Sequence, residues 1–275
     1  MGELVEGDDH LPAEVVGKWV KDKHDLLCRY IDITRAARSK YLPPDNTGGA
    51  AYIDLFCGPG RCFIEETGEW ADGSAVAAWK QSITSKTPFT RVIVGDADPE
   101  RLAACVTRLK ALGAPVLEIN GKAKDTSFRA RQGAPVYGLN FAFLDPYNLQ
   151  TLDFSVIETL AKIPRIDIMV HVSAMDLQRN LDTHLNNEES AFDAFAPGWR
   201  NVVKLGSQAR TRESVFSHWR NIVGQTGAYT SDDVRLITGS KNQRLYWLLL
   251  AAKHELAHKF WSIISKKTDQ GSLDL

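Results

Sequence analysis

The stretch that decides the fold is Ala51-Tyr52-Ile53-Asp54-Leu55-Phe56-Cys57-Gly58-Pro59-Gly60. Its first seven residues are almost all apolar, which predicts a short buried strand. Gly58 and Gly60 predict a sharp turn directly after that strand, because glycine allows the backbone to bend tightly and to approach a ligand closely. Asp54 lies near the strand end, where its carboxylate could bind an ammonium group or anchor the loop.

Further apolar runs alternate with helical segments along the chain. We expect strands at 91–95, 115–119, 139–144 and 166–172, and helices at 74–85, 99–112 and 154–162. Residues 234–238 and 245–250 predict an antiparallel hairpin with its turn at 239–242, and 255–265 predict a closing helix. The prediction is an α/β, Rossmann-like, doubly wound, mostly parallel seven-stranded sheet with an antiparallel C-terminal strand.

The remaining segments predict additions to this sheet. Residues 12–41 have apolar residues at helical spacing, and 43–49 are a breaker, so 1–49 predict an N-terminal helical extension with a linker. Residues 50–275 would form the main domain, with a helical insertion near 174–230. We expect the polar segment 61–71 to form either a loop that shapes the entrance to the substrate site or a solvent-exposed loop without that role.

Composition narrows the class of protein. The 275 residues are 44% hydrophobic and 24% charged with a formal net charge of −1, which is typical of a globular protein and does not indicate a nucleic-acid binder. The four cysteines form no C-x-x-C pair, so we expect reduced thiols and a cytoplasmic location. We expect no secretory signal in the acidic first ten residues, and the longest apolar run, 246–252, is too short to span a bilayer.

The glycine turn and the next strand end predict a nucleoside site. Position 63, where a dinucleotide fingerprint would have glycine, is Phe63, which argues against NAD and ATP. Asp96 or Asp98 could accept both hydroxyls of a ribose, although Asp98 is equally suited to cap a helix. Asp125 could bind the adenine amino group or lie in an ordinary solvated turn. The predicted cofactor-binding residues are Asp54, Phe56, Gly58, Pro59, Gly60, Asp96, Asp98 and Asp125.

The fourth strand ends in Leu144-Asp145-Pro146-Tyr147-Asn148, which predicts a catalytic group. In amino-methyltransferases of the Asp-Pro-Pro-Tyr type, such a carboxylate accepts from the exocyclic amine and the ring stacks on the flipped base. Here there is one proline and the tyrosine comes one position early. Asp145, Pro146 and Tyr147 are the predicted catalytic residues, and the alternative is that Asp145-Pro146 caps the next helix while Tyr147 packs.

Several segments in order along nearly the whole chain form a recognisable pattern. They are 19–30, 52–61, 66–74 and 143–147, together with Asp167, Arg179-Asn180 and Lys253-His254. In these segments the chain resembles the three-Cys-motif partner proteins, a bacterial family with a methyltransferase-like Rossmann core. The resemblance implies S-adenosylmethionine as cofactor and a separate three-cysteine partner related to radical-SAM enzymes. Catalysis is left open, so the alternatives are a methyltransferase, with a nucleobase amine as one candidate acceptor, and a non-catalytic partner protein.

His254-Glu255-Leu256-Ala257-His258 matches the H-E-x-x-H zinc-protease pattern, but no His or Glu follows it as a third ligand. We therefore predict no metal site and keep a zinc hydrolase as a remote alternative.

Basic residues interleaved with aromatic residues between 129 and 246 could form a nucleic-acid face or, as the stronger interpretation, a solvated surface over an aromatic core. They are Arg129, Arg131, Arg179, Arg200, Lys204, Arg210, Arg212, Arg220, Arg235, Lys241 and Arg244, with Trp199, Phe216, Trp219 and Tyr246.

Overall fold

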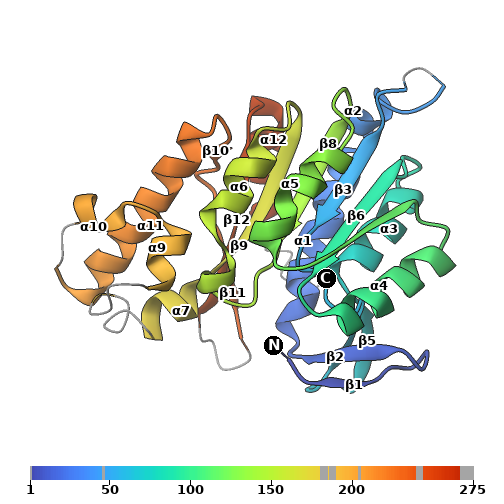
Figure 1. Ribbon diagram of the computed structural model, residues 1–275, viewed down its shortest axis with the longest axis horizontal. Helices are drawn as coiled ribbons and strands as arrows, with labels where there is room; N and C mark the ends of the chain where they lie inside the picture. The colour runs from blue at the N-terminus through green and yellow to red at the C-terminus, as the bar shows by residue number, and fades with distance from the viewer. Residues whose placement is uncertain are drawn as a thin grey trace, which may run out of the picture.

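A computed structural model describes residues 2–44, 47–179, 185, 190–203, 206–239 and 244–266. Its large sheet has the strand order β10-β12-β9-β8-β3-β6-β7, with β11 also paired to β12 (Figure 1). The strands are β3 (Ala50–Asp54), β6 (Arg91–Asp96), β7 (Val116–Asn120), β8 (Leu139–Leu144), β9 (Ile166–Ser173), β10 (Tyr229–Thr230), β11 (Arg235–Thr238) and β12 (Arg244–Ala252).

The strand directions confirm the predicted fold class. In the sheet, β9, β8, β3, β6 and β7 follow one another, and each neighbouring pair among them is parallel. The next strand, β12, runs antiparallel to β9. The sheet has eight strands in the described part of the chain instead of the expected seven, because the short β10, which was not predicted, also pairs with β12. The predicted C-terminal hairpin is present, since β11 pairs with β12, although its turn residues 240–243 lie outside the described residues.

Helices cover both faces of the large sheet, as a doubly wound fold requires. The side chains of β3 alternate between the two hydrophobic cores, with Ala51 and Ile53 in one and Ala50 and Tyr52 in the other. One core is covered by α5 (Ala123–Gly133) and α6 (Phe154–Ala161), together with helices of the insertion. The other is covered by α1 (Trp19–Ile33), α3 (Ser74–Thr84), α4 (Pro99–Ala111) and α12 (Glu255–Ser265). The short α2 (Arg35–Ser39) follows α1.

A second, four-stranded sheet corrects two expectations from the sequence. It has the order β1 (Leu4–Glu6), β2 (Pro12–Val16), β4 (Arg61–Ile64), β5 (Glu69–Asp72) and lies beside the N-terminus in Figure 1. Residues 12–16 are thus a strand rather than part of a helix, and 61–71 form a hairpin rather than a loop. Parallel pairing of β2 with β4 outweighs local helical spacing, because it buries Ala13, Cys62 and Ile64.

The expected insertion, residues 174–230, is mostly helical in its described parts, but its last two residues form β10 of the large sheet. It contains α7 (Ala174–Arg179), α9 (Ala191–Phe195), α10 (Trp199–Val202) and α11 (Gln208–Gln225), and Figure 1 shows these helices beyond the β10 side of the sheet. Asn180, Lys204, Lys241 and two residues of the predicted linker, 45–46, lie outside the described residues. All four cysteines are free. Within the described ranges, no helix has the length and apolar character needed to cross a bilayer.

Candidate functional site

Three carboxylates meet at one edge of the large sheet, and this edge is the candidate site. Asp54 ends β3, Asp96 ends β6, and Asp145 follows β8 directly. Because β3 pairs in parallel with both β6 and β8, the three residues share the carboxyl edge of the sheet. In open α/β sheets this edge, at the point where the strand order reverses, is where ligands bind. We call it the crest.

Asp54 is a buried anchor for the chain around it. Its carboxylate accepts hydrogen bonds from the backbone N–H of Phe56 (3.1 Å), the hydroxyl of Ser74 (2.6 Å) and the hydroxyl of Tyr52 (3.1 Å). Burial raises the pKa of Asp54 to about 7, although these donors favour the charged form. Of the two roles expected from the sequence, the structure assigns the loop anchor. Phe56 packs against the core with its side chain partly buried.

The two glycines of the turn serve different purposes. Gly60 has a φ of +80°, and a Cβ there would lie 3.2 Å from the Cα of Cys105, so this glycine allows close packing against α4. Gly58 also has a positive φ, of +56°, but a Cβ there would meet only the Glu14 carboxylate, at 3.5 Å. Gly58 is therefore the position where the backbone is open to a ligand. As expected, the turn does not begin a helix but continues into β4.

Asp96 joins the glycine turn to the neighbouring strand. One carboxylate oxygen accepts the N–H of Gly58 (3.0 Å), and the other accepts the N–H of Asp98 (2.9 Å). Burial raises the pKa of Asp96 above its ordinary value. Asp98 instead caps α4 by accepting from the N–H groups of Glu100 and Arg101. The geometry thus favours Asp96 over Asp98 as the ligand-facing acid.

Asp145 lies in a buried ionic cluster that the sequence did not predict. The Lys23 ammonium contacts one of its oxygens, and Nδ1 of His171 lies 2.7 Å from the other. Burial alone would raise the pKa of Asp145, but Lys23 and His171 outweigh burial and hold it well below its usual range. Burial and the adjacent Lys23 lower the pKa of His24 to about 4.

The other predicted site residues lie away from this cluster. The Tyr147 side chain is 61% exposed and lies outside the cluster around Asp145. The next helix is capped by Asn148, whose side chain accepts from Thr151, and not by Asp145-Pro146. Asp125 is exposed in the first turn of α5, while the Asn120 amide donates to the Asp96 carbonyl. The structure therefore brings together Asp54, Asp96 and Asp145, but not Asp125 or Tyr147.

Arg108 fastens the N-terminal strands to the glycine turn. Its guanidinium donates to the carbonyls of Pro59 (2.6 Å) and Pro12 (2.7 Å) and pairs with the Asp9 carboxylate at 2.6 Å. Arg101 acts in the same way, through the Gly2 carbonyl and an ion pair with Glu14 at 2.9 Å. Both arginines are buried side chains of α4, and helix propensity alone does not predict which side chains of a helix are buried. The N-terminal segment thus borders the crest at Gly58.

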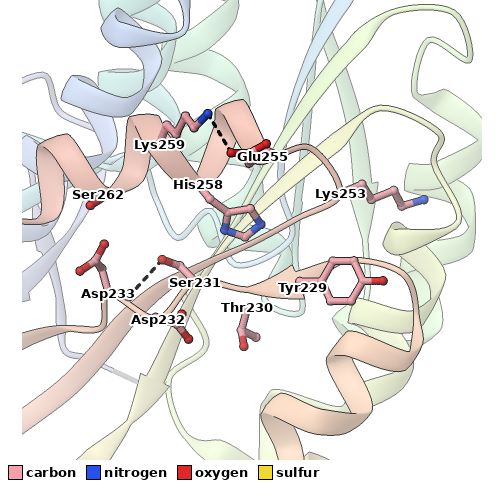
Figure 2. A pocket seen from close by; sticks show the side chains of 10 residues that line it. All are labelled: Tyr229, Thr230, Ser231, Asp232, Asp233, Lys253, Glu255, His258, Lys259 and Ser262. Carbon is pink, nitrogen blue, oxygen red and sulfur yellow. Dashed lines mark hydrogen bonds and ion pairs between the residues drawn. The ribbon is translucent and has the colours of Figure 1, made fainter.

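The H-E-x-x-H residues do not converge on a metal site. His254 precedes α12 and caps it, because its Nδ1 accepts the N–H of Leu256 at 3.1 Å. His258 Nε2 lies 3.1 Å from the Ala252 carbonyl. Glu255 pairs with Lys259 at 2.8 Å, and Figure 2 draws this ion pair. In the described ranges, no group of three or more His, Cys, Asp or Glu residues could hold a metal ion.

The cavity in Figure 2 lies away from the crest. It has a volume of about 520 Å³ and is bordered by β10, the residues after it and α12. Tyr229 of β10 pairs with Ala252, which in turn pairs with Asp167 near the start of β9. The cavity is therefore at the amino edge of the parallel strands, opposite the edge where such folds bind nucleosides.

The aromatic residues proposed as stacking platforms are mostly core residues. Trp199 is 3% exposed and Trp219 is fully buried, the latter stacked on Phe195 with ring centroids 5.2 Å apart. Arg200 packs over the Trp199 ring at 4.6 Å and pairs with Asp193. These contacts favour the interpretation as a solvated surface over an aromatic core.

Comparison with known proteins shows that the structure of this chain is similar to solved methyltransferase structures. No family model and no curated protein matches the chain. A Bacillus cereus O-methyltransferase in complex with SAH has a TM-score of 0.47 and 11% identity, with 82% of this chain and 80% of that chain covered. A proposed O-methyltransferase from Klebsiella pneumoniae has a TM-score of 0.46 and 11% identity (86% and 87% covered).

A third solved structure is a geranyl diphosphate methyltransferase in complex with GPP and sinefungin. Its TM-score is 0.33 and its identity 14%, with 81% of this chain and 78% of that chain covered. At these TM-scores and identities, none of the three similarities says what this chain binds or does.

Proposed function

We propose that this protein binds S-adenosylmethionine at the crest and transfers its methyl group. The observation that carries the proposal is the hydrogen bond from the Gly58 amide to the Asp96 carboxylate. It joins an open backbone position to an acid at the neighbouring strand end, and a carboxylate oxygen has lone pairs left for a ribose diol. The turn continues into a strand, which does not suit a pyrophosphate.

The residues of the crest fit a nucleoside in defined roles. Asp96 would accept the ribose hydroxyls, Gly58 would let the backbone approach the ligand, and Asp54 with Pro59 would hold the turn in place. Asp125 stays a prediction for the adenine amino group, which would require the exposed carboxylate to turn toward the crest. When bound, S-adenosylmethionine supplies an electrophilic methyl group, and the protein supplies position and exclusion of water.

A nucleobase amine is the methyl acceptor that Asp145-Pro146-Tyr147 predicts. For it to hold, the amine must reach a lone pair of the Asp145 carboxylate that Lys23 and His171 leave free, within a cluster that is mostly buried. Tyr147 must also fold inward from its exposed position to stack on a base. The motif therefore supports this acceptor more strongly than the geometry does.

The Lys23–Asp145 ion pair favours one alternative. A carboxylate neutralised by a lysine of the same chain suits a non-catalytic protein that keeps the fold and binds the three-cysteine partner implied by the resemblance. Copurification with such a partner, together with failure to bind S-adenosylmethionine, would establish this alternative.

Label transfer tests the proposed reaction. The purified protein is incubated with S-adenosylmethionine carrying a tritiated methyl group and with cell extract separated into nucleic-acid, protein and small-molecule fractions. The proposal predicts that one fraction gains label, and that Asp96→Asn reduces the gain while the exposed-site control Glu158→Gln does not. Binding of the cofactor without label in any fraction would exclude methyl transfer and favour the partner alternative.

A further inference from the structure

Glu14 places a carboxylate at the open side of the glycine turn. It lies on β2 of the small sheet and is paired in register with Cys62 of β4. A Cβ added to Gly58 would lie 3.5 Å from Oε2 of Glu14 and, apart from its chain neighbours, within 4 Å of no other atom of the described residues. A ligand that packs on the backbone at Gly58 therefore meets this carboxylate.

The two oxygens of the Glu14 carboxylate have different surroundings. Oε1 accepts the N–H of Gly2 (3.0 Å) and pairs with the Arg101 guanidinium at 2.9 Å. Oε2 has no hydrogen-bond donor among the residues that the structure describes. The side chain is 21% exposed, and Oε2 is not among the fully buried atoms that lack a partner. Oε2 is therefore a free acceptor that a ligand can reach.

The charges around Glu14 favour a cationic ligand group. Arg101 pairs with both Glu14 (2.9 Å) and Asp98 (3.6 Å), so one guanidinium is shared between two carboxylates. Asp96 is a third carboxylate close enough to interact with Arg101 and Asp98. An excess of carboxylates at one partly buried site attracts a positive charge. S-adenosylmethionine carries two positive groups, its sulfonium and its α-ammonium.

Asp54, the carboxylate of β3 that could also bind an ammonium group, is already occupied. Its oxygens accept hydrogen bonds from Tyr52, Phe56 and Ser74, and the residue is fully buried. An ammonium group at the glycine turn therefore needs another acceptor, and Glu14 offers one.

We propose that Glu14 binds the α-ammonium group of S-adenosylmethionine and so selects nucleosides that carry the amino-acid arm. The sulfur has three substituents. With the ribose on Asp96 and the methyl group facing Asp145, the amino-acid arm passes over Gly58 toward β2. The ammonium group donates a charge-assisted hydrogen bond to Oε2 of Glu14. This inference rests on the proposed function, because it needs S-adenosylmethionine at the crest.

Arg101 is the positioning residue for this contact. It holds Oε1 of Glu14, and its guanidinium also donates to the Gly2 carbonyl, so that β2 is fixed beside α4. The small sheet, which is no part of the parallel sheet, thereby contributes a side chain to the ligand site.

Two ligands that differ only in the ammonium group test the contact. They are S-adenosylhomocysteine and its deamino analogue, in which hydrogen replaces the α-amino group. Titration calorimetry measures both dissociation constants. We expect the wild type to bind the deamino analogue about ten- to hundredfold more weakly, because a hydrogen bond between charged groups is lost.

Glu14→Gln should remove this preference. The glutamine keeps a carbonyl oxygen for the Gly2 amide and Arg101 but loses the charge. It should bind S-adenosylhomocysteine about ten- to hundredfold more weakly than the wild type. It should bind the deamino analogue within about twofold of the wild type, or more tightly, because no ammonium contact is lost.

Three further variants complete the comparison. Glu6→Gln, at an exposed carboxylate of β1, should bind both ligands as the wild type does. Asp96→Asn should weaken both ligands alike, since it acts on the ribose that they share. Should Glu14→Gln fail to fold, Glu14→Asp keeps the charge beside Arg101 but withdraws the carboxylate by one methylene, and it should reduce the preference for the ammonium group.

The outcomes separate this inference from the proposed function. Equal binding of the two ligands by the wild type, equal weakening of both by Glu14→Gln, or an unchanged preference in Glu14→Asp would overturn the role of Glu14. Each of these results leaves binding at the crest in place. Failure of the wild type to bind either ligand would overturn both proposals.

Discussion

The backbone N–H of Gly58 donates a 3.0 Å hydrogen bond to the Asp96 carboxylate, which joins the turn after β3 to the end of β6. The two residues are 38 positions apart in the chain. Their contact exists only because β3 and β6 pair in parallel and end at the same edge. The proposed nucleoside site depends on this contact.

Replacement of Asp96 by asparagine should weaken S-adenosylmethionine binding about ten- to hundredfold, since a hydrogen bond to a charged group contributes about 1.5–3 kcal/mol. Asp98→Asn is the matched control, because asparagine caps a helix as well as aspartate does. Equilibrium dialysis with labelled cofactor measures both. Equal weakening by the two variants, or weakening by Asp98→Asn alone, would contradict the assignment of Asp96.

The stability contributed by Asp54 should fall as pH rises. Burial raises the pKa of Asp54 from its ordinary value of about 3.8 to about 7 in the folded protein. The folded state therefore holds this proton more tightly than the unfolded state, and ionisation costs stability between these two pKa values. The cost is at most about 1.4 kcal/mol for each pH unit in that window.

Urea unfolding of the wild type and Asp54→Asn checks this sign. Between about pH 5 and about pH 8, the wild type should lose stability relative to the variant, whose side chain does not titrate. Glu158→Gln, at an exposed carboxylate on α6, should track the wild type at both pH values. A constant difference between wild type and Asp54→Asn across the range would show that Asp54 ionises as it does in the unfolded chain.

Arg108→Met should destabilise the fold by about 2–4 kcal/mol, because it leaves the Pro59 and Pro12 carbonyls without this donor. The loss of the Asp9 ion pair adds little, since the Asp9 side chain is 40% exposed. The control is Lys110→Met on the same helix, where the ion pair with Glu118 is exposed and 3.5 Å long. The control should change the free energy of unfolding by no more than about 0.5 kcal/mol. Similar values for both variants would mean that the N-terminal strands are not fastened by Arg108.

Lys23→Met should destabilise the protein by about 3–5 kcal/mol, since removal of one partner leaves the buried Asp145 carboxylate without its cation. The double variant Lys23→Met/Asp145→Asn should regain part of this loss, because the uncompensated charge is removed. Lys21→Met, two residues away and exposed, should behave like the wild type. A double variant that is no more stable than Lys23→Met would contradict the explanation that the lost stability comes from an uncompensated buried charge.

The parallel sheet was predictable because β3, β8 and β9 are short apolar runs that are almost wholly buried, and such runs can be recognised locally. The small sheet was missed because its pairing is long-range, Glu14 with Cys62 for example. A local signal did exist in Gly68, a turn residue between the two strands, whose φ is +67°. The sequence of 61–64 has three apolar residues in a row, so the alternating burial of this strand could not be read from it.

The carboxylates of the crest were predictable from their positions after strands, but their partners were not. Lys23 is 122 residues from Asp145, and His171 is an ordinary polar residue in an apolar strand. Which side chains neutralise a buried acid depends on how α1 packs on the sheet, and spacing in the sequence does not encode this. The same holds for Tyr147, whose exposed position follows from the course of the chain after Pro146.

The central claim is that the crest holds S-adenosylmethionine, and titration calorimetry on the purified chain measures this most directly. The account predicts saturable binding of one cofactor molecule per chain, competed by S-adenosylhomocysteine and weakened by Asp96→Asn but not by Asp98→Asn. Absence of binding heat, together with an unchanged melting temperature at saturating cofactor concentrations, would contradict it.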